Sequence, residues 1–156
     1  MKKQKGFSLI ELLIVVAIIL IIAAIAIPNL LRSRMAANQA SAVGSIRTIN
    51  TSAVTYSSTY QAVGFPASLA AMGGPDPCTA ASTAACLIDA VLAAGTKSGY
   101  TFVWTSDGAT PSVGYSITGN PVTMGTTGGV GYFSDQSGVI RGAPGAAATA
   151  TSPALQ

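Results

Sequence analysis

The order of apolar and polar positions sets the first part of the chain apart from the rest. Residues 7–31 are almost continuously apolar, and Glu11 is their only charged side chain. A helix over this stretch would be about 38 Å long at 1.5 Å per residue, which exceeds the roughly 30 Å thickness of bilayer hydrocarbon. A buried core helix rarely stays apolar on all sides for this length. The pattern therefore predicts a membrane-spanning helix over residues 7–31.

Helical periodicity continues beyond the apolar stretch. Apolar side chains recur at steps of three and four positions, namely Ala36, Ala40, Val43, Ile46, Ile49, Ala53, Tyr56 and Tyr60, and polar side chains occupy the other side. This predicts an amphipathic half-helix over residues 32–61 that packs on a globular head. Gly64 and Phe65-Pro66 end it.

Residues 62–99 form a connecting region in this interpretation. A short helix over residues 67–72 precedes the breaker sequence at residues 73–77, and a second short helix is predicted over residues 86–94. Cys78 and Cys86 lie between the two helices.

Strand patterns dominate residues 100–141. Alternating, β-branched and aromatic segments occur at residues 100–105, 113–118, 130–134 and 139–141, with a turn at residues 135–138. They predict an antiparallel sheet of three or four strands that covers the helix. Residues 142–156 are rich in Ala, Thr and Pro and are expected to be flexible. The fold class predicted is α+β.

The charge of the chain sits at its start. The net charge of +3 comes from Lys2, Lys3 and Lys5, because the remaining five cations balance five acids. The positive-inside rule then keeps the N-terminus in the cytoplasm and exports everything after residue 31. No basic stripe with interleaved aromatic residues is present, so nucleic acid is not an expected partner.

The two cysteines favour a disulfide in an exported domain, and two free buried thiols are the alternative. A structural zinc site needs four ligands, and the chain has no histidine. No catalytic constellation is recognisable either, since the usual acid, base and triad partners are missing. We therefore expect that the chain binds no metal and no cofactor and that it is not an enzyme.

A carboxylate in a membrane helix costs roughly 2.5–3.5 kcal/mol on insertion scales, so Glu11 is a candidate functional residue. The surrounding sequence, KGFSLIELLIVVAII, closely resembles the class III signal of type IV prepilins and type II secretion pseudopilins. Gly6, Phe7 and Glu11 match the motif at its spacing, and Pro28 matches a proline found in type IV pilins. The resemblance covers about residues 1–35.

This resemblance implies the pilin fold and a life cycle. Residues 1–6 would be a leader that a prepilin peptidase removes after Gly6, and the new terminus at Phe7 would be N-methylated. Glu11 would then meet the Phe7 amine of a neighbouring subunit, and Pro28 would loosen the helix on assembly. Alternatively, Glu11 forms an intramolecular pair with Phe7 four residues away or snorkels toward the headgroups.

The main expectation is a structural subunit of a type IV pilus, stored in the inner membrane and assembled with identical subunits by a platform and its ATPase into an extracellular filament. One alternative is a periplasmic type II secretion pseudopilin, many of which bind calcium. Here 27 residues separate Asp107 from Asp135, and the two form no acidic cluster in the sequence. A monomeric, signal-anchored exported domain is the other alternative. Motility, adhesion and DNA uptake are family roles that the sequence does not separate.

Overall fold

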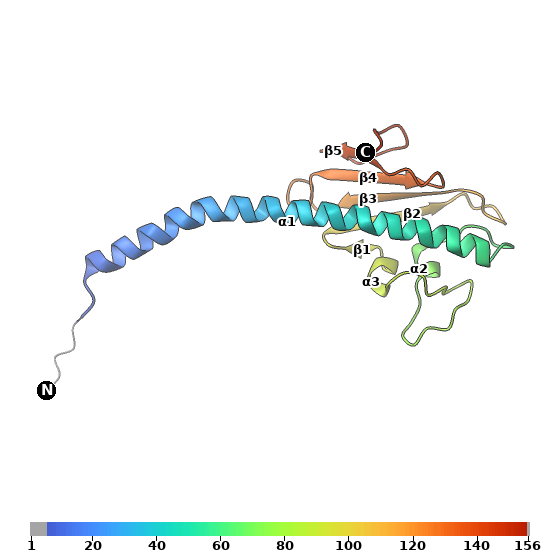
Figure 1. Cartoon of the computed structure of the whole chain (residues 1–156), viewed down its shortest axis with the longest axis horizontal. Helices are drawn as coiled ribbons and strands as arrows, with labels where there is room; N and C mark the ends of the chain where they lie inside the picture. The colour runs from blue at the N-terminus through green and yellow to red at the C-terminus, as the bar shows by residue number, and fades with distance from the viewer. Residues whose placement is uncertain (1–5, 156) are drawn as a thin grey trace. The chain divides into compact units, whose positions relative to one another are not determined.

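The computed structural model describes residues 6–155, so Lys2, Lys3 and Lys5 lie outside the described residues. The helices are α1 (Leu9–Thr59), α2 (Leu69–Met72) and α3 (Ala90–Ala93). The strands are β1 (Thr96–Lys97), β2 (Tyr100–Ser106), β3 (Tyr115–Pro121), β4 (Val130–Asp135) and β5 (Arg141–Pro144), as Figure 1 shows. The chain divides into two compact units, Met1–Arg34 and Met35–Gln156, and α1 belongs to both.

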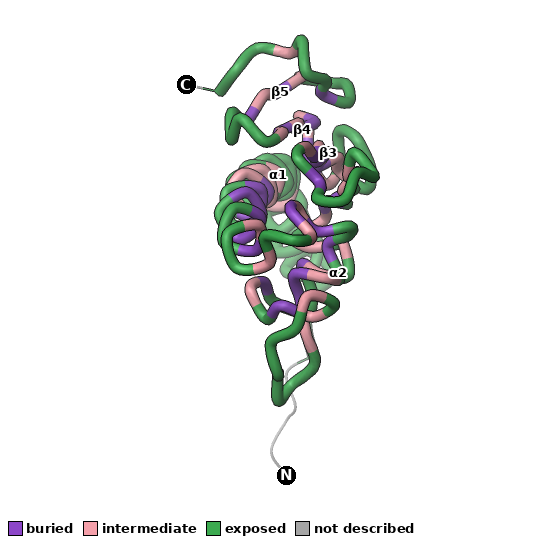
Figure 2. The backbone as a smooth tube through the Cα atoms, turned by 90° about the vertical axis from the view of Figure 1, so that its right-hand side faces the viewer, coloured by how far each residue is buried: buried purple, intermediate pink, exposed green. Residues whose placement is uncertain are grey.

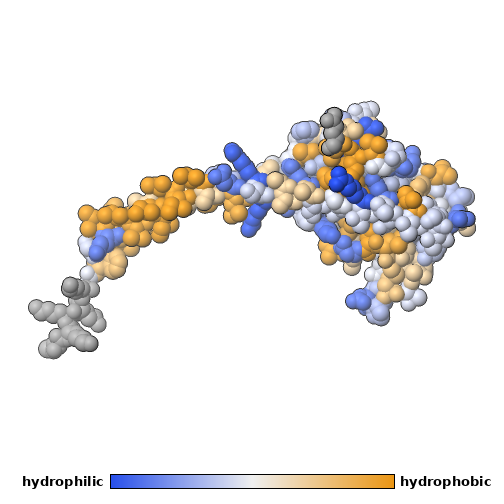
Figure 3. Space-filling view, viewed as in Figure 1, coloured by the Kyte–Doolittle hydropathy of each residue, from blue (hydrophilic) through white to orange (hydrophobic). Residues whose placement is uncertain are grey.

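The first unit contains the apolar part of α1. Helical structure continues through Pro28 without interruption, although a proline nitrogen cannot donate to the preceding turn. The helix is long and apolar enough to cross a membrane, and none of its most apolar 18-residue window is buried. Figure 3 shows this stretch as a mostly apolar surface with one hydrophilic patch near its start.

The second unit, which we call the head, is built on an antiparallel sheet. Its five strands follow one another in the order β1-β2-β3-β4-β5. Tyr100 pairs with Pro121 and Ser106 with Tyr115 along β2 and β3, and Ser116 pairs with Asp135 across β3 and β4. The α+β class predicted from the sequence is confirmed, with one strand more than the three or four expected.

The core of the head lies between α1 and the sheet. From α1 it takes Ala42, Ile46, Ile49, Ala53 and Tyr56, and from the strands Tyr100, Phe102, Tyr115, Ile117 and Tyr132. Figure 2 shows the buried face of the helix turned toward the strands. Ala36 and Ala40, which share the predicted apolar periodicity, are exposed, so burial begins at Ala42.

The connecting region differs from expectation around Cys86. Helix α3 covers only Ala90–Ala93, whereas the sequence predicts a helix over residues 86–94. The backbone N–H groups of Cys86 and Leu87 donate instead to the carbonyls of Gly73 and Met72, which holds this segment beside α2. Asp89 then caps α3 by accepting the Leu92 N–H at 2.9 Å.

Cys78 and Cys86 form the predicted disulfide. It closes a projecting loop, and residues 75–81, which lead into this loop and begin it, are exposed. The Tyr56 hydroxyl of α1 donates to the Ser82 carbonyl, so the helix also holds the far side of the loop.

The C-terminal segment, expected to be flexible, is tied to the sheet in the structure. The Leu155 N–H donates to the Ile140 carbonyl at 2.8 Å, and the Gly142 N–H donates to the Pro153 carbonyl at 3.0 Å. Ala148 is buried. Residues 153–155 thus lie along β5 and satisfy part of its outer edge.

Candidate functional site

The predicted cleavage position lies just outside the helix. Gly6, Phe7 and Ser8 have no regular secondary structure, and α1 begins at Leu9. The Phe7 side chain is 83% exposed. An exposed, non-helical peptide bond after Gly6 has the form that a peptidase needs, because no packing has to be broken to extend it.

Glu11 is hydrogen-bonded at the start of the helix. Its Oε2 accepts the backbone N–H of Ser8 at 2.9 Å. Ser8 occupies the cap position and Glu11 the third helical position, which is the carboxylate half of a capping box. A carboxylate here also meets the positive end of the helix dipole. In the described chain Glu11 therefore holds the first turn of α1.

Sequence reasoning missed this second role, although the Ser-x-x-Glu spacing is visible at residues 8–11. The cap also changes the geometry expected for Phe7. Because α1 begins at Leu9, Phe7 precedes the helix and does not share a helical face with Glu11. Within residues 6–155, the side chains of Phe7 and Glu11 make no contact, so the pairing of the Phe7 amine with Glu11 remains a prediction.

A polar network joins α1 to the sheet inside the head. Asn50 Nδ2 donates to Ser134 Oγ at 2.8 Å, and the Tyr115 hydroxyl donates to Asn50 Oδ1 at 3.1 Å. Ser134 Oγ in turn donates to the Val139 carbonyl at 3.0 Å. The pKa of Tyr115 is raised to about 12, first by burial and then by the nearby Asp135 carboxylate.

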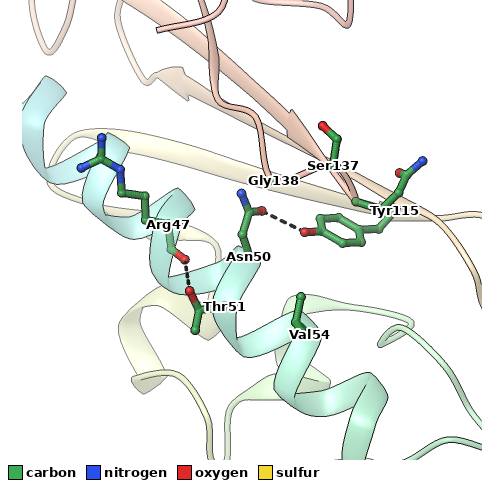
Figure 4. A pocket seen from close by; sticks show the side chains of 8 residues that line it. Arg47, Asn50, Thr51, Val54, Tyr115, Ser137 and Gly138 are labelled. Carbon is green, nitrogen blue, oxygen red and sulfur yellow. Dashed lines mark hydrogen bonds between the residues drawn. The ribbon is translucent and has the colours of Figure 1, made fainter. Parts of the chain in front are cut away.

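A hollow of about 430 Å³ opens beside this network. Its lining consists of Arg47, Asn50, Thr51, Val54, Tyr115, Gln136, Ser137 and Gly138. Figure 4 shows that α1 forms one side of it and that the turn between β4 and β5 forms the other. We call it the Arg47 hollow.

The two acids considered for calcium are held by the protein itself. Both carboxylate oxygens of Asp107 accept hydrogen bonds, from the Ser112 hydroxyl and the N–H groups of Ala109, Val113 and Gly114. These bonds lower the pKa of Asp107, the Ser112 hydroxyl most strongly. Asp135 Oδ1 accepts the Ser137 N–H at 2.9 Å. Over residues 6–155, no group of three or more metal-binding side chains comes together.

Comparison with known proteins finds a family match for the N-terminal segment. The family described as the prokaryotic N-terminal methylation motif matches residues 1–27. A relative from Thermus thermophilus, named type IV wide pilus major component PilA4, is 66% identical over 38 residues. Residues 1–27 therefore carry the prokaryotic N-terminal methylation motif, and the chain is similar to a type IV pilin over 38 residues.

The sequence similarity to the Thermus relative is limited to 38 residues. The match with the Thermus relative covers 24% of the chain and 29% of the relative. No solved structure matches the chain. The segment that matches the methylation motif contains Gly6, Phe7 and Glu11, and the architecture of a long helix packed on an antiparallel sheet is pilin-like.

Proposed function

We propose that the chain is a structural subunit of a type IV pilus, processed at its N-terminus and polymerised through α1. The observation that carries this proposal is the combination at residues 6–31: an accessible Gly6–Phe7 bond, a single acid one helical turn later, and an apolar helix with no packing of its own. An apolar surface this large requires a membrane or other protein chains to cover it.

The exposed side of the second half of α1 supports the same function. No charged residue occurs from Thr48 to Thr59. The hydroxyls of Thr48, Thr51 and Thr55 donate to the carbonyls four residues earlier, at 3.0–3.1 Å. Their donors are thus already used within the helix, and the face that they form can be covered without stranding a hydroxyl hydrogen.

Before assembly the subunit would be a single-pass protein of the inner membrane. The lysines of the leader keep the N-terminus in the cytoplasm under the positive-inside rule. A prepilin peptidase cuts after Gly6 and methylates the new terminus at Phe7. A platform and its ATPase then move the mature subunit into a filament of identical copies outside the cell.

Cleavage gives Glu11 a second partner in this proposal. The new Phe7 amine lies one residue before Ser8, so an amine and a carboxylate stand at the same end of α1. In the filament, Glu11 accepts the Phe7 amine of a neighbouring subunit. Pairing offsets the cost of burying each charge alone and favours one stagger of the helices.

Three variants of the full chain, compared with the wild-type chain in the cells that produce it, test this function. Gly6→Val blocks cleavage, because a branched side chain enters the extended backbone at the scissile position. Glu11→Val leaves cleavage intact and abolishes filaments. Glu11→Gln also abolishes filaments, although a glutamine still accepts the Ser8 N–H in a capping box.

The glutamine variant separates the two roles of Glu11. Filaments sheared from the cell surface are quantified by electron microscopy, and the mature terminus is read by mass spectrometry. Abundant filaments from Glu11→Gln would assign Glu11 to the helix cap alone. Surface filaments lacking the wild-type chain altogether would overturn the proposed function.

A further inference from the structure

We propose that the disulfide loop of one copy, residues 75–86, docks into the Arg47 hollow of the next copy, with Asp76 facing Arg47. This interface rests on the proposed function, since it requires copies held side by side. It adds a contact between heads to the contacts between helices.

Asp76 is an acid without an internal partner in the described part of the head. Asp89 pairs with Lys97 at 2.8 Å and caps α3, and the carboxylates of Asp107 and Asp135 accept the backbone bonds described above. The Asp76 carboxylate accepts no hydrogen bond and joins no ion pair among residues 6–155. It is exposed at the base of the projecting loop.

Arg47 is the corresponding cation. Its guanidinium is exposed at the hollow, and within residues 6–155 it forms no ion pair. No acid occurs in the chain between Glu11 and Asp76, so α1 supplies no carboxylate three or four residues from Arg47. The other cations of the head are engaged, Lys97 by Asp89 and Arg141 by the Ser152 carbonyl. An unpaired acid and an unpaired cation thus remain on one head.

The loop and the hollow carry compatible side chains, and the loop is already ordered. Between its cysteines the loop contains only Thr, Ala and Ser, and the hollow offers Thr51, Gln136 and Ser137. The disulfide, the Ala81–Ala84 backbone pair and the Tyr56 hydroxyl hold the loop in place. A loop that is already ordered loses less conformational entropy on docking than a flexible one.

The two surfaces lie on different sides of the same head. The loop follows α2 and leads into α3, which packs on β1 at one edge of the sheet. The hollow reaches the turn between β4 and β5, at the other end of the strand order. A contact between two different patches of identical chains is heterologous, and it builds an open filament when its rotation does not close a ring.

Charge reversal in the full chain tests the interface. Arg47→Asp and Asp76→Arg each place like charges opposite one another, and we expect each to lower the yield of sheared filaments about tenfold or more. The double variant restores the opposite pair and is expected to return to about the wild-type yield. Val122→Glu, which adds an exposed charge outside both surfaces, serves as the control and is expected to leave the yield unchanged.

Disulfide trapping provides a second readout. Thr51 lines the hollow and Ala80 is exposed in the loop. In filaments of a chain with both Thr51→Cys and Ala80→Cys, oxidation should produce a ladder of linked subunits on a non-reducing gel. Neither single variant should produce the ladder, because the interface is heterologous.

The outcomes separate this interface from the function on which it rests. Absence of filaments from the wild-type chain overturns the proposed function. Wild-type filaments together with unaffected reversal variants, or with a double variant as poor as the singles, overturn the interface alone. A ladder from either single cysteine variant also overturns it.

Discussion

Asn50 is the residue that joins helix α1 to the sheet by side-chain hydrogen bonds in the core. It is 8% exposed, and its amide links Ser134 of β4 with the Tyr115 hydroxyl of β3. Apolar neighbours such as Ile46 and Ile49 pack without directional preference, so they allow the helix to slide. The amide permits one register, because only there do both of its partners fall within reach.

Removing this amide should destabilise the head. Asn50→Ala leaves the Tyr115 hydroxyl buried without its acceptor, and we expect the free energy of unfolding to fall by about 1–3 kcal/mol. Denaturant unfolding of the full chain in detergent measures the change. Thr51→Ala is the matched control, because Thr51 is exposed and bonds only within its own helix; its effect should stay within about 0.5 kcal/mol. Equal losses from the two variants would contradict the role of Asn50.

Two buried tyrosines make the stability of the head depend on pH in the alkaline range. Burial raises the pKa of both Tyr100 and Tyr115 from 10.0 to about 12, helped by Tyr132 and Asp135 respectively. The unfolded chain therefore releases these protons at lower pH than the folded chain does. Their contribution to stability is complete below pH 10 and is lost as the pH rises toward 12.

Unfolding curves across this alkaline range test the effect. The stability of the wild-type chain should decline between pH 10 and 12, and tyrosinate absorbance should rise together with unfolding. Tyr115→Phe, whose ring cannot ionise, should show a shallower decline. An unchanged slope in this variant would separate alkaline unfolding from Tyr115.

At the scale of elements, the sequence predicts structure that depends on neighbouring residues, but it does not predict structure that depends on pairing with distant segments. The N-terminal segment could be predicted because its chemistry lies within six neighbouring residues. Strand β1 has only two residues and no period to detect. The length of α3 was wrong because backbone bonds from Cys86 and Leu87 to a segment more than ten residues earlier outweigh helix propensity. The C-terminal pairing with Ile140 and Gly142 likewise depends on a partner that composition does not reveal.

A substitution at a glycine in β4 tests whether the C-terminal segment is docked on the sheet. A Cβ at Gly131 would collide with the Ala146 backbone and lie 2.8 Å from Asn120 Oδ1. Gly131→Ala should therefore displace residues 146–147 and lower stability by about 1–3 kcal/mol. Hydrogen exchange should become faster in the C-terminal segment before it does so elsewhere.

Gly44→Ala is the matched control with the opposite sign. Apart from the adjacent backbone of α1 itself, no atom lies within 4 Å of a Cβ at this exposed position. Alanine there should raise stability by about 0.5–1 kcal/mol, because it restricts the unfolded chain and favours the helix. A loss of stability in both variants would point to a general intolerance of substitution instead of a docked C-terminal segment.

At the scale of the whole molecule, the core belongs to one unit only. Every buried residue of α1 lies at Ala42 or beyond, and the described part of Met1–Arg34 contributes none. Asn38 Nδ2 donates to the Thr127 carbonyl at 2.8 Å, which fixes α1 to the head still earlier along the chain. The head therefore has a core of its own, to which the apolar half of the helix contributes no buried residue.

A truncated chain should therefore fold without the apolar half. A fragment of residues 35–156 keeps the core, the Asn38 bond and the disulfide, and we expect it to be soluble, monomeric and to unfold in one cooperative step. A fragment of residues 47–156 loses Ala42 and Ile46 from the core and should lose cooperative unfolding, because it exposes the apolar surface beside Gly119 that Ile46 covers. Light scattering and denaturant unfolding of the two fragments measure these outcomes. If the longer fragment aggregates or unfolds without cooperativity, the apolar half supports the head as well as the filament, and the division of labour within α1 is wrong.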